Sequence, residues 1–149
     1  MDGIDIQIIR ELSKNADMTA TELSKKMHFS VPAVNKRIRN MKRDGVIKNF
    51  TIITDNKKLG KPLIAFILIV LKSVEHTEAF FQYVESDADI LECYAITGEY
   101  DCLLKVCAAS VEDLDKKLAI LKTRNGVMKS YTMLSLTAHK YTPTVLADE

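Results

Sequence analysis

Residues 19–45 contain two short helix-forming segments joined by a tight turn, and this pattern constrains the fold of the 149-residue chain more than any other. Thr19 followed by Glu22 has the spacing of a capping box, which begins a helix. Ser30 is typical of the N-cap of a second helix, and Gly45 is typical of the residue just after its end. The sequence therefore predicts a helix-turn-helix.

The second of these helices, residues 31–43, has one apolar side and one basic side. At about 100° per residue, the apolar positions gather on one side of the helix. The side expected to pack consists of Val31, Val34, Ile38, Met41 and Gly45. The cations, opposed only by Asp44, are Lys36, Arg37, Arg39, Lys42 and Arg43. A short capped helix followed by a basic one is how small domains present a helix to the major groove of DNA.

We expect the basic side to contact double-stranded DNA. Arg and Asn side chains suit the edges of guanine and adenine, and small apolar groups suit thymine methyls. The candidate DNA-binding residues are Ser30, Pro32, Ala33, Asn35, Lys36, Arg37, Arg39, Asn40 and Arg43. The alternative is a solvated charged surface. The charge distribution opposes it, because residues 1–50 carry ten Lys and Arg against six Asp and Glu, whereas the remainder carries eleven against fourteen.

The second half of the chain alternates between strand-like and helix-like patterns. Their order, βαββαβ, is that of the ferredoxin-like fold. The expected strands are residues 64–71, 90–96, 102–106 and 127–137, and the expected helices are residues 75–84 and a segment capped by Ser110. Residues 46–54 have β-type composition and predict a short strand leading out of the first domain. The fold class is α+β, with a helix-turn-helix domain at 1–50, a linker strand and hinge at 51–62, and a ferredoxin-like domain at 63–149.

The strand at residues 64–71 is apolar on both faces. A strand with one solvated face alternates apolar and polar residues. Two helices cover only one face of the sheet, and leaving the other wet would cost a few kcal/mol at about 25 cal/mol per Å². The sequence therefore predicts a homodimer that packs sheet on sheet.

Several functional classes are disfavoured. Cys93, Cys102 and Cys107 form no C-x-x-C pair, which indicates small buried thiols rather than a disulfide framework or a metal site. The three histidines are widely spaced and no catalytic motif is present, so we expect neither an enzyme nor catalytic residues. No signal peptide is recognisable and the longest apolar run has nine residues, so we expect a cytoplasmic protein without a membrane segment.

Three segments in this order resemble the leucine-responsive regulatory protein/AsnC (feast/famine) family: residues 5–12, 37–47 and 97–105. The resemblance runs from residue 2 to about residue 138. It implies a DNA-binding transcriptional regulator in which the helix-turn-helix domain is winged-helix-like and residues 63–149 form a ferredoxin-like ligand-sensing and oligomerisation domain. It also implies dimers that commonly assemble into octamers. Two departures leave the operator sequence open. Val31 separates the cap serine from its proline, and Lys36 and Lys42 stand where family members often have acidic residues.

The resemblance also implies a small effector, typically an amino acid, bound at a contact between dimers. The matching residues are Thr97, Gly98, Glu99, Tyr100 and Asp101, with Met133, Leu134 and Ser135 walling the pocket. Gly98 would let backbone N–H groups approach a carboxylate, and Asp101 or Glu99 would hold an ammonium group. A plain polar turn is the alternative for the loop, and an amino acid sensor without specific DNA function is the alternative for the protein. No other cofactor is expected.

Overall fold

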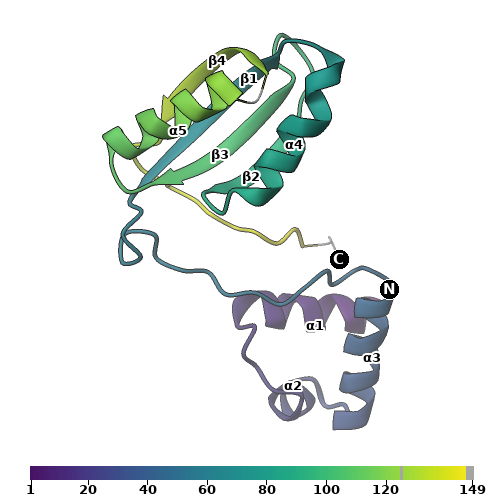
Figure 1. The fold of residues 1–149 in the computed structure, drawn as a ribbon. Coiled ribbons are helices and arrows are strands. Elements are labelled where there is room, and N and C mark those ends of the chain that lie inside the picture. The colour runs from purple at the N-terminus through teal and green to yellow at the C-terminus, as the bar shows by residue number, and fades with distance from the viewer. Residues whose placement is uncertain (125, 147–149) are drawn as a thin grey trace. The chain divides into compact units, whose positions relative to one another are not determined.

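The computed structural model describes residues 1–124 and 126–146. The chain divides into two compact units, drawn in Figure 1. One unit is Met1–Ile53 together with the tail from Lys140, and the other is Thr54–His139. Among the described residues, no helix is long and apolar enough to cross a membrane.

The first unit consists of three helices, and side chains cap all of them at their N-termini. The helices are α1 (Gly3–Lys14), α2 (Ala20–Met27) and α3 (Val31–Arg43). Asp2 caps α1, Thr19 caps α2 in a capping box with Glu22, and the Ser30 hydroxyl accepts a hydrogen bond from the Ala33 N–H at 3.4 Å. The predicted caps of the helix-turn-helix are therefore confirmed.

One residue after each of α2 and α3 has a left-handed backbone conformation. His28 ends α2 with φ 59°, and Gly45 follows α3 with φ 73°. Glycine tolerates this region without steric cost, so Gly45 suits its predicted position just after the helix. The three helices pack around a core of Ile8, Leu12, Leu23, Val34 and Met41.

The strand predicted over residues 46–54 is wrong. In the described part of the chain these residues join no β-ladder. Phe50, Ile52 and Ile53 supply β-type composition, yet their side chains are 43%, 81% and 64% exposed. Composition alone does not make a strand, because its backbone groups need a neighbouring strand to pair with.

The predicted hinge begins as an ordered turn. The Asp55 carboxylate accepts a hydrogen bond from the Lys57 N–H at 2.9 Å, and the Lys61 N–H donates to the Asn56 carbonyl at 2.9 Å. Such side-chain bonds to nearby backbone are typical of turns that begin with Asp. The chain therefore enters the second unit through a defined local structure.

The second unit is a four-stranded antiparallel sheet with the strand order β2-β3-β1-β4. Its elements are β1 (Leu63–Leu71), the short 3-10 helix η1 (Val74–His76), α4 (Thr77–Ser86), β2 (Ile90–Ala95), β3 (Cys102–Ala108), α5 (Val111–Arg124) and β4 (Val127–Leu134). This is the predicted βαββαβ fold. The last strand ends before residue 137, after the Ser135 N–H donates to the Ile64 carbonyl at 2.8 Å.

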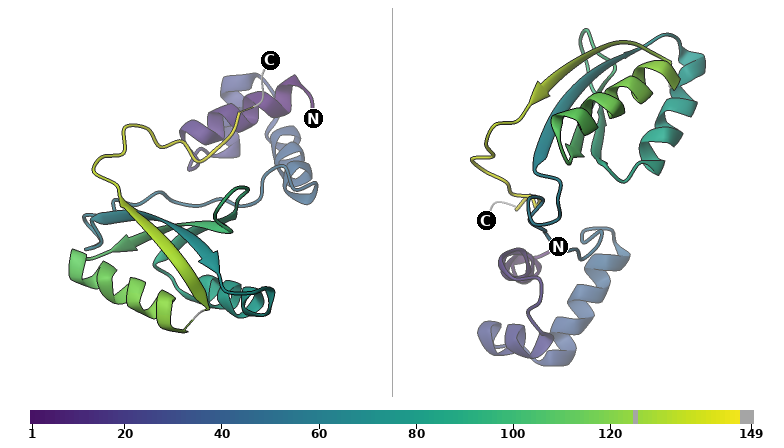
Figure 2. Two further views of the ribbon diagram at one scale, coloured as in Figure 1. Left: turned by 90° about the horizontal axis from the view of Figure 1, so that it is seen from above. Right: turned by 60° about the vertical axis from the view of Figure 1, so that its left-hand side comes forward.

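Both helices of this unit cover the same face of the sheet (Figure 2). Between them and the sheet lies a core that includes Ile67, Phe80 and Leu104, each 0% exposed. Cys102 and Cys107 are also buried, and burial raises the pKa of the Cys102 thiol to about 12. Cys102 and Cys107 are thus small buried groups, as the sequence predicts, whereas Cys93 is only half-buried.

Among the described residues of this unit, no helix covers the opposite face of the sheet (Figure 2). Because side chains alternate along a strand, the neighbours of buried Ala65, Ile67 and Ile69 point to this side. We call it the open sheet face. Its apolar and aromatic members on β1 and on the paired strands are Ile64, Phe66, Leu68, Val70, Leu103, Tyr131 and Met133, and the register also places Lys105 opposite Phe66 and Lys129 opposite Val70 on this face. Most of them are apolar and only partly buried, as the sequence predicts for this side of the strand.

A small charged cluster lies where the turn meets the sheet. The Asp89 carboxylate, 15% exposed, accepts hydrogen bonds from the ammonium groups of Lys61 and Lys117. The bonds from Lys117 and Lys61 lower the pKa of Asp89 to about 2, from an ordinary value of 3.8. A lowered pKa stabilises the folded state above pH 4, and this contribution is lost as the pH falls toward 2.

We expect Asp89→Asn to lower the free energy of unfolding by about 1–2 kcal/mol at pH 7. At pH 3 the difference in free energy of unfolding between variant and wild type should be about half as large. Urea unfolding of both proteins at pH 7, 5 and 3 measures this. Asp115→Asn, at an exposed position of α5, is the matched control and is expected to change little at any pH. A difference independent of pH would contradict the assignment.

Candidate functional site

The packed side of α3 is narrower than predicted. Val34 and Met41 are 1% and 4% exposed, whereas Val31 and Ile38, also expected in the core, are only half-buried. Asn40, expected at the centre of the exposed side, is half-buried as well, and so is Ala33. The exposed side of α3 is therefore centred closer to Asn35 and Lys42 than the sequence predicts.

Arg37 is half-buried and lies on the side of α3 that contacts α1. Its guanidinium donates to the Asp5 carboxylate at 2.8 Å and to both oxygens of Asp2 at 2.9 and 3.0 Å. Hydrogen bonds to Asp5 and Asp2 raise the pKa of Arg37. These bonds join α3 to α1 on the Arg37 side of the helix. Arg37, predicted to contact DNA, thus connects two helices in the structure.

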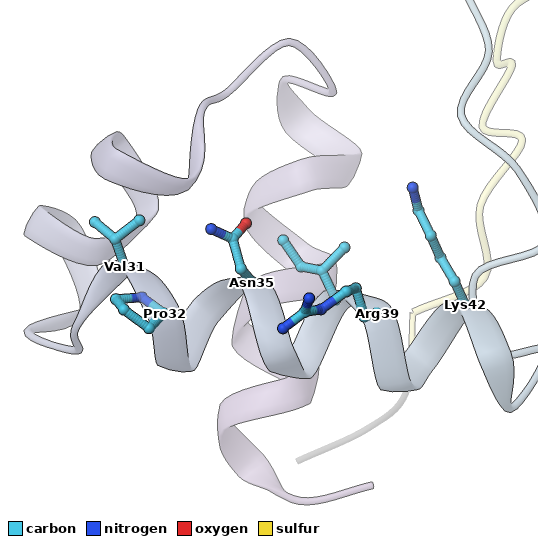
Figure 3. Close-up of a pocket in the computed structure, with 6 residues that line it drawn as sticks. Val31, Pro32, Asn35, Arg39 and Lys42 are labelled. Carbon is cyan, nitrogen blue, oxygen red and sulfur yellow. The ribbon is translucent and has the colours of Figure 1, made fainter.

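A hollow of about 510 Å³ lies along this exposed edge. We call its lining residues the reading face: Val31, Pro32, Asn35, Ile38, Arg39 and Lys42, five of them labelled in Figure 3. They lie on successive turns of α3 and present three apolar side chains, one amide and two cations. No acidic residue is among them.

Three of the predicted DNA-binding residues, Pro32, Asn35 and Arg39, are thus brought together in the hollow. Sequence reasoning missed Val31, Ile38 and Lys42 as site residues. The available signal was their position beside Asn35 on a helical wheel. The apolar character of Val31 and Ile38 indicated a place in the core. Lys42 was counted only as one of several cations on the helix.

The remaining cations of α3 differ in how firmly they are held. The Arg43 Nε donates to an Asp44 carboxylate oxygen at 2.8 Å, but both side chains are more than half exposed, and such pairs contribute little. The Lys42 Nζ lies 4.6 Å from the centre of the Phe50 ring, a cation–π contact. Lys36 and Arg39 are exposed and form no ion pair with any described residue. These four cations are available to a polyanion.

The loop predicted to bind an effector is exposed from Thr97 to Glu99, and Gly98 has φ 115°. Asp101 is partly engaged. Its carboxylate accepts a hydrogen bond from the Leu71 N–H at 2.7 Å, and its own N–H donates to the Ile69 carbonyl at 2.8 Å. These bonds join the loop to the C-terminal end of β1.

Met133, Leu134 and Ser135 lie at the other end of β1. Met133 pairs with Phe66, and the Ser135 N–H bonds to the Ile64 carbonyl. Met133 and Leu134 also point to opposite faces of the sheet. Within one chain the structure therefore does not bring these residues to the loop, so a pocket containing both groups would need two copies.

The β4 residue that does reach the loop is Lys129. Its ammonium lies 5.3 Å from the centre of the Tyr100 ring. The strand register explains this, because Lys129 pairs with Val70 near the same end of β1. Sequence reasoning missed Lys129, since the register of β4 cannot be read from its residues alone.

Comparison with known proteins gives the same two-part division. Residues 1–48 match a family model described as winged helix-turn-helix DNA-binding, and residues 64–145 match the Lrp/AsnC ligand binding domain. The chain is 33% identical over 142 residues to the HTH-type transcriptional regulator FL11 of Pyrococcus abyssi, covering 95% of this chain and 93% of that protein.

Solved structures are similar over almost the whole chain. The structure of E. coli AsnC has a TM-score of 0.88 at 28% identity and covers 99% of each chain. The transcriptional regulator NMB0573 of Neisseria meningitidis, solved in complex with L-Met, has a TM-score of 0.92 at 25% identity and covers 97% of this chain and 96% of that one. The family models, the sequence relative and these structures agree, and the chain belongs to the Lrp/AsnC family of DNA-binding transcriptional regulators.

Proposed function

We propose that this regulator binds its operator through the reading face of α3, with Arg39 and Asn35 at the bases and Lys36 and Arg43 at the phosphates. The observation that carries the proposal is the set of exposed cations on α3 that have no firm acidic partner. Such a surface attracts the phosphate backbone, and the amide and guanidinium can read base edges. The protein would act in the cytoplasm, where its DNA lies.

Operator binding is expected to depend steeply on salt. If about four cations per subunit neutralise phosphates, a dimer gives a slope of log affinity against log salt near −7. Fluorescence anisotropy with the DNA upstream of the protein's own gene measures this slope. A slope near zero, or no binding at nanomolar protein, would favour the alternative, an amino acid sensor without specific DNA function.

We expect Arg39→Ala to weaken operator binding about tenfold to a hundredfold, because a bidentate contact to a base contributes about 1–3 kcal/mol. Assembly should be unchanged, since Arg39 is exposed and lies outside both cores. Anisotropy titrations and sedimentation velocity measure the two properties. Lys122→Ala, at an exposed position of α5, is the matched control and is expected to bind as wild type. Loss of assembly in Arg39→Ala would show that this side of α3 faces another subunit.

We further propose that the subunit pairs with a second copy through the open sheet face and that these homodimers assemble further, for example into octamers. Support comes from the apolar composition of that face and from its lack of a covering helix. Burying several such side chains is worth a few kcal/mol at about 25 cal/mol per Å².

An amino acid effector bound at residues 97–101 is the last part of the proposal. Support comes from the L-Met complex of the Neisseria relative and from the exposed glycine in this loop. Glu99 is the acidic residue best placed to hold an ammonium group, because one oxygen of Asp101 already accepts the Leu71 N–H. A neighbouring subunit would then contribute its Met133, Leu134 and Ser135 to the pocket.

A melting-temperature screen against the twenty amino acids tests this part. A ligand at one hundred times its Kd stabilises the folded protein by about 2.7 kcal/mol, so the correct effector is expected to raise the melting temperature by several degrees. Glu99→Gln should abolish that rise, and Glu112→Gln, an exposed position of α5, should retain it. A flat screen would contradict an amino acid effector.

A further inference from the structure

We infer that the reading face recognises a half-site in which a guanine, bound by Arg39, and an adenine, bound by Asn35, lie about two base pairs apart, with a thymine methyl beyond the adenine. This inference rests on the proposed operator binding and specifies the DNA sequence that this surface prefers.

The chemistry of the hollow selects which base edges fit it. In the major groove, Arg pairs bidentately with guanine O6 and N7, and Asn pairs with adenine N6 and N7. Arg39 forms no ion pair with any described residue, so its fork of donors is free to do this. No carboxylate lines the hollow, and therefore the cytosine amino group has no charged acceptor there.

Apolar side chains occupy the N-terminal end of the reading face. Val31 and Pro32 lie at the first two positions of α3, and both line the hollow. An apolar surface at the floor of the major groove favours the C5-methyl group of thymine, the only methyl that the bases present there. Val31 is half-buried rather than packed in the core, which leaves part of its surface for this contact.

The spacing follows from helix geometry. A rise of about 1.5 Å per residue separates Asn35 from Arg39 by about 6 Å along the axis, which is close to two base-pair steps of about 3.4 Å. Val31 precedes Asn35 by a further turn, about 6 Å. If α3 lies along the groove, the three contacts follow in the order thymine, adenine, guanine.

The cations outside the hollow take the sequence-independent role. Lys36 and Arg43 are exposed on α3 but do not line the hollow. They therefore point toward a groove wall, where phosphates lie, when the reading face meets the bases. This division separates the residues that should change the preferred sequence from those that should change only affinity.

Selection of randomised duplexes by the full-length protein tests the inference. Wild type should enrich a half-site with an adenine and a guanine about two base pairs apart. Arg39→Gln should change the preference at the guanine position alone, toward adenine, because Gln pairs with adenine. Asn35→Ala should relax the adenine position alone. Lys36→Ala is the matched control and should keep the enriched sequence while lowering both affinity and the salt slope.

Base analogues in the enriched duplex test the individual atoms. Replacing the guanine by 7-deazaguanine removes the N7 acceptor and should weaken wild type by about tenfold, but Arg39→Ala much less. Replacing the thymine by uracil removes the methyl group and should weaken wild type severalfold, but Val31→Ala much less.

Two outcomes would overturn the inference, and they differ from each other. An enriched sequence that is the same for wild type and Arg39→Gln, with equal loss of affinity for every duplex, would make Arg39 a phosphate contact. Operator binding would then still be supported, but the assigned base contacts would be wrong. Absence of salt-dependent binding to any duplex would overturn the proposed function and the base contacts together.

Discussion

Phe80→Ala is expected to lower the free energy of unfolding of the second unit by about 3–5 kcal/mol. The Phe80 ring is 0% exposed and packs in the core between α4 and the sheet, with Ile67 and Leu104 in the same cluster. The loss combines the transfer free energy of the ring with the cavity that it leaves. Domains are typically stable by about 5–15 kcal/mol, so the variant would retain little stability.

Urea unfolding of the full chain, followed by far-UV circular dichroism, measures this effect. Phe81→Ala is a matched control on the same helix. The two rings are in contact, with centres 5.5 Å apart, but Phe81 is only half-buried. We expect a distinctly smaller loss for Phe81→Ala. Equal losses for the two variants would show that the core does not centre on Phe80.

The second large effect is expected from a charge on the open sheet face. Leu68 pairs with Leu103 on one side and Tyr131 on the other, at the middle of this face. In the proposed dimer, Leu68→Asp would bury a carboxylate without a partner, which costs several kcal/mol. We therefore expect the variant to be monomeric at concentrations where wild type is a dimer or larger, as measured by sedimentation velocity.

Leu68→Asp should leave the subunit folded, because Leu68 is only half-buried in the single chain. Circular dichroism checks this point. Val74→Asp is the matched control, since Val74 is 88% exposed and lies in η1, away from the sheet. It should assemble as wild type. A dimeric, folded Leu68→Asp protein would show that the subunits associate through another surface.

Local signals made much of the fold predictable. The caps and turns depend on contacts between residues only a few positions apart, so they can be recognised without knowing the rest of the fold. The examples are Thr19 with Glu22, Ser30 and Gly45. The apolar pattern of β1 was also sufficient to predict an open sheet face, because alternation and the number of covering helices are both readable from the sequence.

Long-range contacts explain what the sequence did not reveal. Arg37 is bound by the carboxylates of Asp2 and Asp5, more than thirty positions away along the chain. A helical wheel contains no information on such a partner. For the same reason the wheel placed Val31 in the core and Asn40 at the centre of the exposed side.

The candidate effector site shows a similar limit. Within one chain Asp101 and Met133 lie toward opposite ends of β1, so the predicted pocket at a contact between dimers would need Met133 from a second subunit. Register depends on pairing across the sheet, which one strand's residues do not specify. The strand predicted at 46–54 failed because pairing also requires a second strand, and none lies beside it in the described chain.

The attachment of Asp101 to β1 has a mechanical consequence. Ile69 and Leu71 anchor the loop at one end of this strand, and Lys61 and Pro62 lead into its other end. β1 is an interior strand, hydrogen-bonded on both sides, and it cannot slide without breaking two ladders. A displacement of the loop relative to the sheet would therefore require the bonds of Asp101 to the Leu71 N–H and the Ile69 carbonyl to break.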